Sequence, residues 1–82
     1  MLFADQEIAA LEALLFVAKE PLSIPKLADI LEVSEENAVE LLQSLQERYE
    51  IKASGLTLVE IDKCYRLGTK PEMSPYIEAL YK

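Results

Sequence analysis

Residues 34 to 49 form the segment that most limits what this chain can fold into. Apolar side chains repeat there with a period of about 3.6 and share one face of a helix: Ala38, Leu41, Leu42, Leu45 and Tyr49. The opposite face carries an acidic stripe: Glu36, Glu40, Gln43, Glu47 and Glu50. Such a helix needs an apolar neighbour on one side, and its outer side repels a polyanion.

The first helix is expected to begin at an Asp5 N-cap and to reach about Lys19, with Pro21 ending it. Its expected core face consists of Ile8, Leu11, Leu14, Leu15 and Ala18. A second apolar set covers much of the other side: Ala9, Ala10, Ala13, Phe16 and Val17. Only Glu12 and Lys19 leave a narrow polar strip, so this helix needs burial on two sides.

The two following helices carry clear start signals. Ser23 is the expected N-cap of a helix over residues 24–32, in which Pro25 is tolerated at a first-turn position. Its expected core side chains are Leu27, Ile30 and Leu31. Ser34 is the expected N-cap of the third helix, and the acids that follow it suit the positive end of the helix dipole.

The last third of the chain predicts a hairpin and a short helix. Segments 56–61 and 64–69 are rich in β-forming residues and flank Asp62-Lys63, whose turn type the sequence leaves open. Gly68 indicates either a bulge or a close backbone approach. Ser74 is the expected cap of the last helix, with Pro75 at its first position.

This order of elements predicts a mainly α (α+β) fold, a winged helix-turn-helix of three helices, a two-stranded wing and a short C-terminal helix. Residues 1–82 are expected to be a single domain. A domain of this size has a thin core, because it buries only about 60% of its unfolded surface. Burial against a partner would therefore add considerably to its stability.

Composition argues against catalysis, metals and cofactors. The chain has no histidine, no glycine-rich phosphate loop and no nucleophile with an adjacent base. One cysteine and scattered carboxylates lack the spacing of metal ligands, and Cys64 is expected to be a small apolar residue of a strand. With no signal sequence and no apolar run near 20 residues, the expected location is the cytoplasm, away from membranes.

Charge argues against nucleic acid as the partner. Fifteen acidic against eight basic residues give a net charge of −7. Each carboxylate about 4 Å from a phosphate costs about 1 kcal/mol even in water, and the acidic stripe supplies four of them. The nearby cations, Arg48 together with Lys63, Arg66 and Lys70 of the wing, are too few to offset this. No sequence-specific DNA binding is expected.

The excess apolar surface of the first helix has two explanations. Either the wing and the last helix cover it within one domain, or it forms a self-complementary patch for an isologous dimer. The second explanation predicts a homodimer, and the apolar residues of the last helix fit either arrangement. The expected interface residues are Ala9, Ala13, Phe16, Val17, Tyr76, Ile77, Leu80 and Tyr81.

Three motifs follow one another along the chain, namely EALLFVA at 12–18, EPLS at 20–23 and YRLGTKPE at 65–72. In this order and spacing they resemble the N-terminal domain of segregation and condensation protein B (ScpB), a family of non-SMC subunits of bacterial condensin. The resemblance covers the whole chain but only the first half of a family member. Lys19 stands where a glycine is common, and Gly68 where a bulky residue is usual.

The resemblance implies a tandem winged-helix protein that forms homodimers through its N-terminal domains. It also implies binding to the kleisin ScpA, which bridges the heads of an SMC ATPase, and a role in chromosome condensation and partition at the nucleoid. The family has no catalytic residues to carry over, and its kleisin contacts fall largely in the second winged helix. The alternative is a DNA-binding winged-helix transcriptional regulator whose basic residues lie outside this chain.

Overall fold

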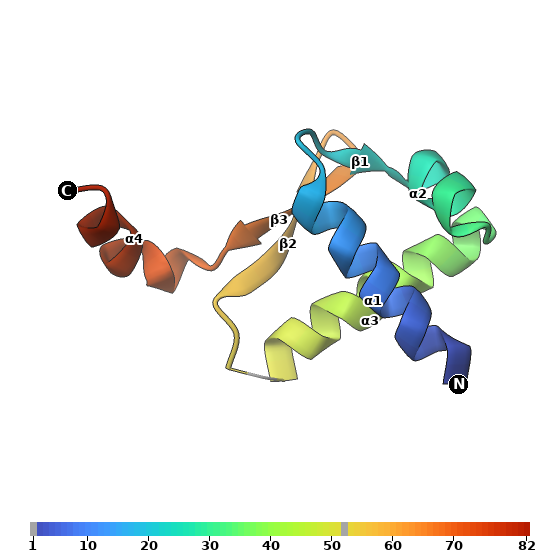
Figure 1. The fold of residues 1–82 in the computed structure, drawn as a ribbon, viewed down its shortest axis with the longest axis horizontal. Helices are drawn as coiled ribbons and strands as arrows, with labels where there is room; N and C mark the ends of the chain where they lie inside the picture. The colour runs from blue at the N-terminus through green and yellow to red at the C-terminus, as the bar shows by residue number, and fades with distance from the viewer. Residues whose placement is uncertain (1, 52) are drawn as a thin grey trace.

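The computed structural model describes residues 2–51 and 53–82, with the side chains from residue 5 onward (Figure 1). Three helices lead into a small sheet, and a short helical segment ends the chain. In order, the elements are α1 (Leu2–Val17), β1 (Leu22–Ser23), α2 (Ile24–Leu31), α3 (Glu35–Ile51), β2 (Leu56–Ile61), β3 (Cys64–Thr69), the 3-10 turn η1 (Pro71–Met73) and α4 (Ser74–Leu80).

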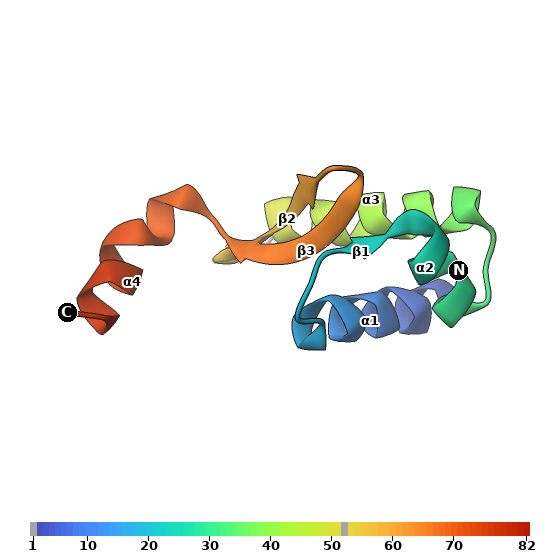
Figure 2. The same cartoon turned by 90° about the horizontal axis from the view of Figure 1, so that it is seen from above.

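The arrangement confirms the winged helix-turn-helix. Helices α2 and α3 pack on each other and on α1, and the β2–β3 hairpin is the wing (Figure 2). The sheet has a third strand that the sequence did not predict, because β1 pairs antiparallel with β3 in the order β1-β3-β2. Two residues are too short a run for an alternating pattern to indicate a strand.

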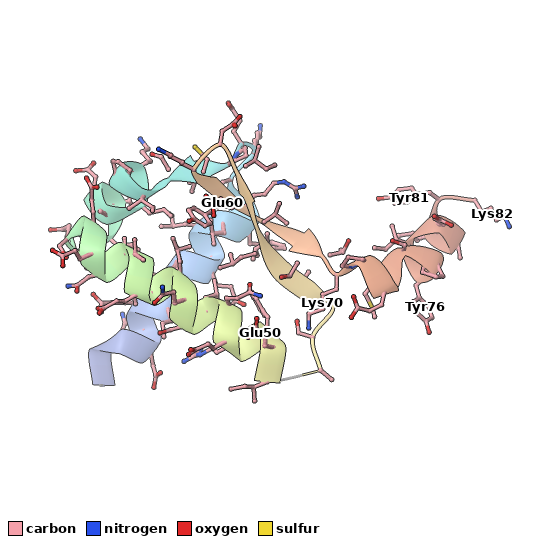
Figure 3. All side chains as sticks on the ribbon, turned by 180° about the vertical axis from the view of Figure 1, so that it is seen from behind. Glu50, Glu60, Lys70, Tyr76, Tyr81 and Lys82 are labelled. Atoms are coloured by element: carbon pink, nitrogen blue, oxygen red, sulfur yellow. The ribbon has the colours of Figure 1, made fainter. Side chains whose placement is uncertain are left out.

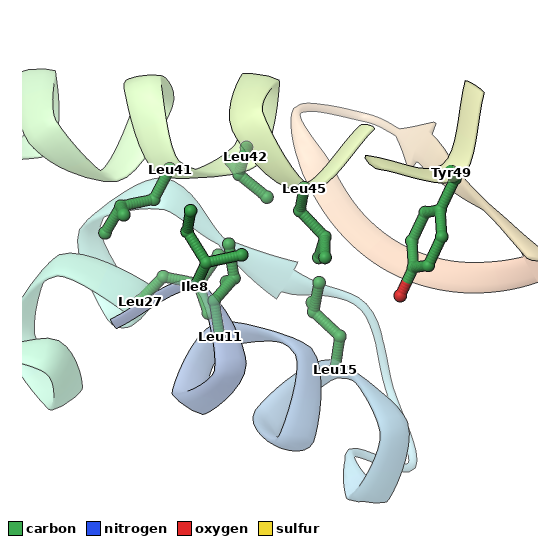
Figure 4. Packing of buried hydrophobic residues seen from close by; sticks show 8 residues of the cluster. All are labelled: Ile8, Leu11, Leu15, Leu27, Leu41, Leu42, Leu45 and Tyr49. Carbon is green, nitrogen blue, oxygen red and sulfur yellow. The ribbon is translucent and has the colours of Figure 1, made fainter. Parts of the chain in front are cut away.

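The core lies where α1 and α3 face each other. Leucines from both helices point into the space between them, and Leu27 of α2 closes one end with no exposed surface (Figure 4). The eight side chains of this cluster are Ile8, Leu11, Leu15, Leu27, Leu41, Leu42, Leu45 and Tyr49. All five residues predicted for the apolar face of α3 are buried, which confirms the 3.6-residue reading of that segment.

Local signals placed two helix starts and the hairpin correctly. The Ser23 hydroxyl accepts the amide of Lys26 at 3.2 Å, and the Ser34 hydroxyl accepts the amide of Asn37 at 3.0 Å. The hairpin turns at Asp62 and Lys63 with φ of 50° and 64°. Positive φ at both positions is the type I′ geometry, whose twist matches that of the strands.

Two predictions for the first two helices are wrong. Helix α1 begins at Leu2 and ends at Val17, so Asp5 lies inside its first turn instead of capping it. The Asp5 carboxylate instead accepts a hydrogen bond from the Arg48 guanidinium at 2.8 Å, a tertiary contact that no local pattern reveals. Ile30 is exposed, whereas its neighbour Ala28 is buried, because α2 turns that side toward α3.

The end of the chain also differs from the expectation. Ser74 is the first residue of α4, and its side chain makes no capping hydrogen bond, because η1 supplies the preceding turn. Residues 71–82, called the arm below, project from the end of the sheet away from the three-helix body (Figures 1 and 2). The last helix therefore lies apart from the core it follows.

Candidate interaction surface

The outward face of α3 is acidic and open to solvent. All five residues of the predicted stripe are exposed, and Figure 3 shows Glu50 at the end of the helix. The nearby cations are engaged elsewhere: Arg48 pairs with Asp5, and the Lys70 ammonium donates to the Tyr49 carbonyl at 2.8 Å. Within residues 2–51 and 53–82, the face at which such folds read DNA thus presents carboxylates while these two cations are held by other partners, which disfavours phosphate binding.

The outer face of α1 carries exposed apolar side chains. Phe16 is 77% exposed and Val17 69%, and Ala9 and Ala13 beside them are open as well. These are the four α1 residues that the sequence predicted for an interface. An exposed phenylalanine on a helix that is otherwise packed against the core indicates a contact site. The small alanine side chains beside it allow another surface to approach closely.

The wing extends this apolar face. Leu56 of β2 and Leu67 of β3 line two hollows on either side of Phe16, of about 270 Å³ and 520 Å³. The surface formed by the outer face of α1 with these two leucines is called the α1–wing groove. Sequence reasoning missed both leucines, although their places in the hairpin were predicted, because only the tertiary fold lays the wing beside α1.

Gly68 forms part of the wall of the larger hollow. The strand register runs without interruption from Leu56–Thr69 to Ile61–Cys64, so Gly68 marks no bulge. A Cβ atom there would lie 2.8 Å from Cγ2 of Val59, so the glycine makes room for a neighbouring side chain and not for the close backbone approach that was expected.

The structure keeps the predicted interface residues of the last helix away from those of α1. Tyr76, Leu80 and Tyr81 are 73%, 75% and 82% exposed, and Ile77 is half-buried. Figure 3 shows Tyr76 and Tyr81 on the last helix, away from the body. Helix α4 packs mainly against η1. The explanation in which this helix covers the second face of α1 within its own domain is therefore wrong, because the apolar side of α4 does not contact the outer face of α1 in one chain.

A third hollow lies between α3 and the sheet, on the same face of the wing as Leu56 and Leu67, because Leu58 is the register partner of Leu67. Its apolar lining is Val39, Leu42, Leu58 and Tyr65, and its volume is about 260 Å³. Gln43 and Glu60 stand at its edge. This α3–wing groove borders the acidic stripe, so it joins an apolar floor to an acidic rim.

One polar contact joins α3 to α1. The buried Tyr49 hydroxyl donates a hydrogen bond to the Glu12 carboxylate, which explains why Glu12 interrupts an otherwise apolar helix. Burial, followed by the bond to Glu12, raises the pKa of the Tyr49 phenol above its ordinary value. Burial and Glu60 likewise raise the pKa of Tyr65. Both tyrosines therefore stay neutral through the physiological range.

Across residues 2–51 and 53–82, His, Cys, Asp and Glu side chains do not gather in threes as a metal site would require. None of the helices in those two ranges has the length and hydropathy needed to cross a bilayer. The surfaces that stand out in the described parts of the chain are thus the two grooves and the arm, all suited to protein contacts.

The sequence matches a known family over most of its length. The profile described as "Segregation and condensation complex subunit ScpB" matches residues 9–82. Segregation and condensation protein B of Desulforamulus reducens is 46% identical over the whole chain, and that of Carboxydothermus hydrogenoformans is 45% identical. The chain spans 45% and 44% of the length of these two relatives.

Solved structures match the fold as well. A crystal structure of a dimer of the ScpB N-terminal domain complexed with ScpA peptide is 36% identical and has a TM-score of 0.87, with 98% of this chain and 99% of that chain covered. ScpB from Mycobacterium tuberculosis is 29% identical with a TM-score of 0.88, over 95% of this chain and 49% of that one. A DNA-binding regulator is not favoured by these matches.

Proposed function

The chain belongs to the ScpB family of condensin subunits, and we propose that it forms the homodimer and takes part in binding the kleisin ScpA. The observation that carries this proposal is the α1–wing groove with Phe16 exposed at its centre. The charge of the chain and its acidic α3 face favour a protein partner over DNA. The similar ScpB domain seen as a dimer with ScpA peptide supports both contacts.

The proposed role is structural and not catalytic, in chromosome condensation and segregation at the nucleoid. Since the chain spans less than half the length of its relatives, we also propose that residues 1–82 are the first of two winged-helix domains. ScpA would link this protein to SMC. The resemblance implied that most kleisin contacts fall in the second domain, yet the ScpA peptide complex of a relative involves an N-terminal domain, so we propose a direct contact here too.

The α3–wing groove is the best supported place for that contact. Val39, Leu58 and Tyr65 offer an apolar floor for a helix or strand of the partner, and the acidic stripe beside it can attract basic side chains. The residues that line this groove, which come from α3 and the wing, are distinct from those that line the two hollows around Phe16, so dimerisation and kleisin binding can occur together.

Paired substitutions test the two contacts. Phe16→Glu should convert the dimer to a monomer with unchanged helix content, because a carboxylate desolvated at an interface costs several kcal/mol whereas an exposed one is tolerated. Val39→Glu on the other groove serves as the matched control and should leave the dimer intact. Sedimentation over a range of concentrations gives the masses. If the unmodified chain is monomeric at every concentration, the dimer proposal is wrong.

Calorimetry with the central segment of ScpA tests the kleisin contact. The 82-residue chain should bind it more weakly than a full-length relative does, by roughly 10²-fold or more, because linking two sites adds their effective concentration. Val39→Glu should weaken the binding further, and Phe16→Glu should affect it less. Equal affinities would mean that residues 1–82 hold the whole ScpA-binding site. Absence of binding by both proteins would contradict the proposed role in binding ScpA.

A titration with duplex DNA tests the competing function. The acidic stripe predicts no sequence-specific binding at physiological salt. Micromolar affinity in fluorescence anisotropy, with competition that depends on sequence, would instead support the DNA-binding regulator.

A further inference from the structure

The arm is anchored at its root. The Lys70 amide donates to the Gly55 carbonyl at 2.8 Å, and the Met73 amide donates to the Lys70 carbonyl at 2.9 Å. The Met73 side chain lies over Gly55, where a Cβ atom would stand 3.4 Å from its Cγ. These contacts fix the direction in which the arm leaves the sheet, and both ribbon views show it pointing away from α1 (Figures 1 and 2).

Beyond that root, the arm is rich in large apolar side chains that remain mostly exposed. Its four large apolar residues cluster on one side: Tyr76, Ile77, Leu80 and Tyr81. Glu78 lies on the other side by the helical period. A helix of seven residues is marginal in water by itself, since helices shorter than about 12 residues need tertiary packing. The arm therefore requires a surface that its own body does not provide.

The larger hollow of the α1–wing groove offers such a surface. Leu15, Phe16, Ala18, Leu56 and Leu67 give it an apolar lining. Two cations, Lys19 and Arg66, and one acid, Glu20, also line it, so the hollow is slightly positive in a chain whose net charge is −7. The acidic residues of the arm, Glu72 and Glu78, complement these cations. This match favours a second copy of the chain, although two such copies repel each other overall.

We propose that the arm of each copy docks in the α1–wing groove of the other, so that the two chains exchange their C-terminal helices. This inference rests on the proposed homodimer and specifies what fills its interface. One chain carries both the arm and the groove, so a twofold axis satisfies both at once and closes the assembly at two copies. The apolar side of the arm and the apolar lining of the groove, which lie apart within one chain, are then both buried.

Cross-linking between two differently tagged chains tests the exchange, with Cys64→Ser in both to remove the native thiol. One chain carries Lys82→Cys at the tip of the arm, and the other carries Lys19→Cys at the rim of the groove. A flexible bismaleimide should join the two chains efficiently. The matched control replaces Lys19→Cys with Glu36→Cys on the acidic face of α3, and its yield of the mixed product should be several-fold lower.

Two results would overturn the exchange. One is an equal yield with the control. The other is a chain carrying both Lys82→Cys and Lys19→Cys that links internally, as a monomer, at high dilution, because the arm would then fold back on its own body. Neither result bears on whether Phe16 lies in a dimer interface, so the proposed homodimer can survive the loss of this inference.

A second measurement uses the apolar side of the arm. Leu80→Ser combined with Tyr81→Ser should raise the dissociation constant of the dimer by at least about tenfold, because two large side chains lose their burial. Circular dichroism should show the body still folded, since neither residue belongs to the core. An unchanged dissociation constant would rule out the exchanged arm, whereas a monomeric unmodified chain would rule out both the exchange and the homodimer.

Discussion

The body and the arm are equally apolar in sequence but opposite in structure. In the body, the leucines of α1 and α3 meet each other, and Leu11, Leu27 and Leu45 are fully buried. In the arm, Tyr76, Leu80 and Tyr81 remain mostly exposed. The difference teaches that amphipathic spacing predicts which side of a helix seeks burial, but the partner of that side depends on where the chain delivers the helix.

Leucine truncations should separate the two regions most strongly. Leu45→Ala should lower the free energy of unfolding by about 3 kcal/mol, because it leaves a cavity between α1 and α3. Leu80→Ala in the arm should change it by less than about 0.5 kcal/mol when the chain is dilute enough to be monomeric. Urea unfolding followed by circular dichroism measures both. Equal losses would mean that the arm is part of the monomer's own core.

Removal of the Tyr49 hydroxyl should give the next largest effect. Tyr49→Phe leaves the half-buried Glu12 carboxylate without its donor and should cost about 1–3 kcal/mol. Since burial raises the pKa of Tyr49 above the ordinary tyrosine value, the unfolded chain ionises first, and stability should fall as pH rises above about 10. The decline should be shallower in Tyr49→Phe.

The control for this pH dependence is Tyr76→Phe in the arm, where the hydroxyl makes no contact with the body. Its unfolding free energy against pH should follow that of the unmodified chain. A Tyr49→Phe curve that instead overlays the unmodified one above pH 10 would contradict the role assigned to the Glu12 contact.

Serine substitutions should give the smallest difference between body and arm. Ser34→Ala removes the hydroxyl that caps α3 and should lower the free energy of unfolding by about 1 kcal/mol. Ser74→Ala removes a hydroxyl without a capping bond and should be neutral. Thermal unfolding of the two variants gives the comparison. A loss of similar size at Ser74 would restore it as a true helix cap.

Much of this fold could be read from local chemistry. The caps at Ser23 and Ser34, the hairpin turn at residues 62 and 63 and the apolar period of α3 depend on neighbours within a few residues, and their order along the chain predicted the winged helix-turn-helix. The third strand, β1, could not be read, because its two residues become a strand only by pairing with β3. Asp5 was misread as a cap for a similar reason, since Arg48 lies 43 residues away.

For the interface the same division holds. By itself, the sequence determined that the outer face of α1 and one side of the last helix carry unpaired apolar residues, because helical period alone sets which side chains share a face. Only the tertiary structure decided that Leu56 and Leu67 complete the groove around Phe16 and that the arm leaves the body. These outcomes follow from contacts between residues distant in sequence, such as Lys70 with Gly55 and with Tyr49, which no local pattern encodes.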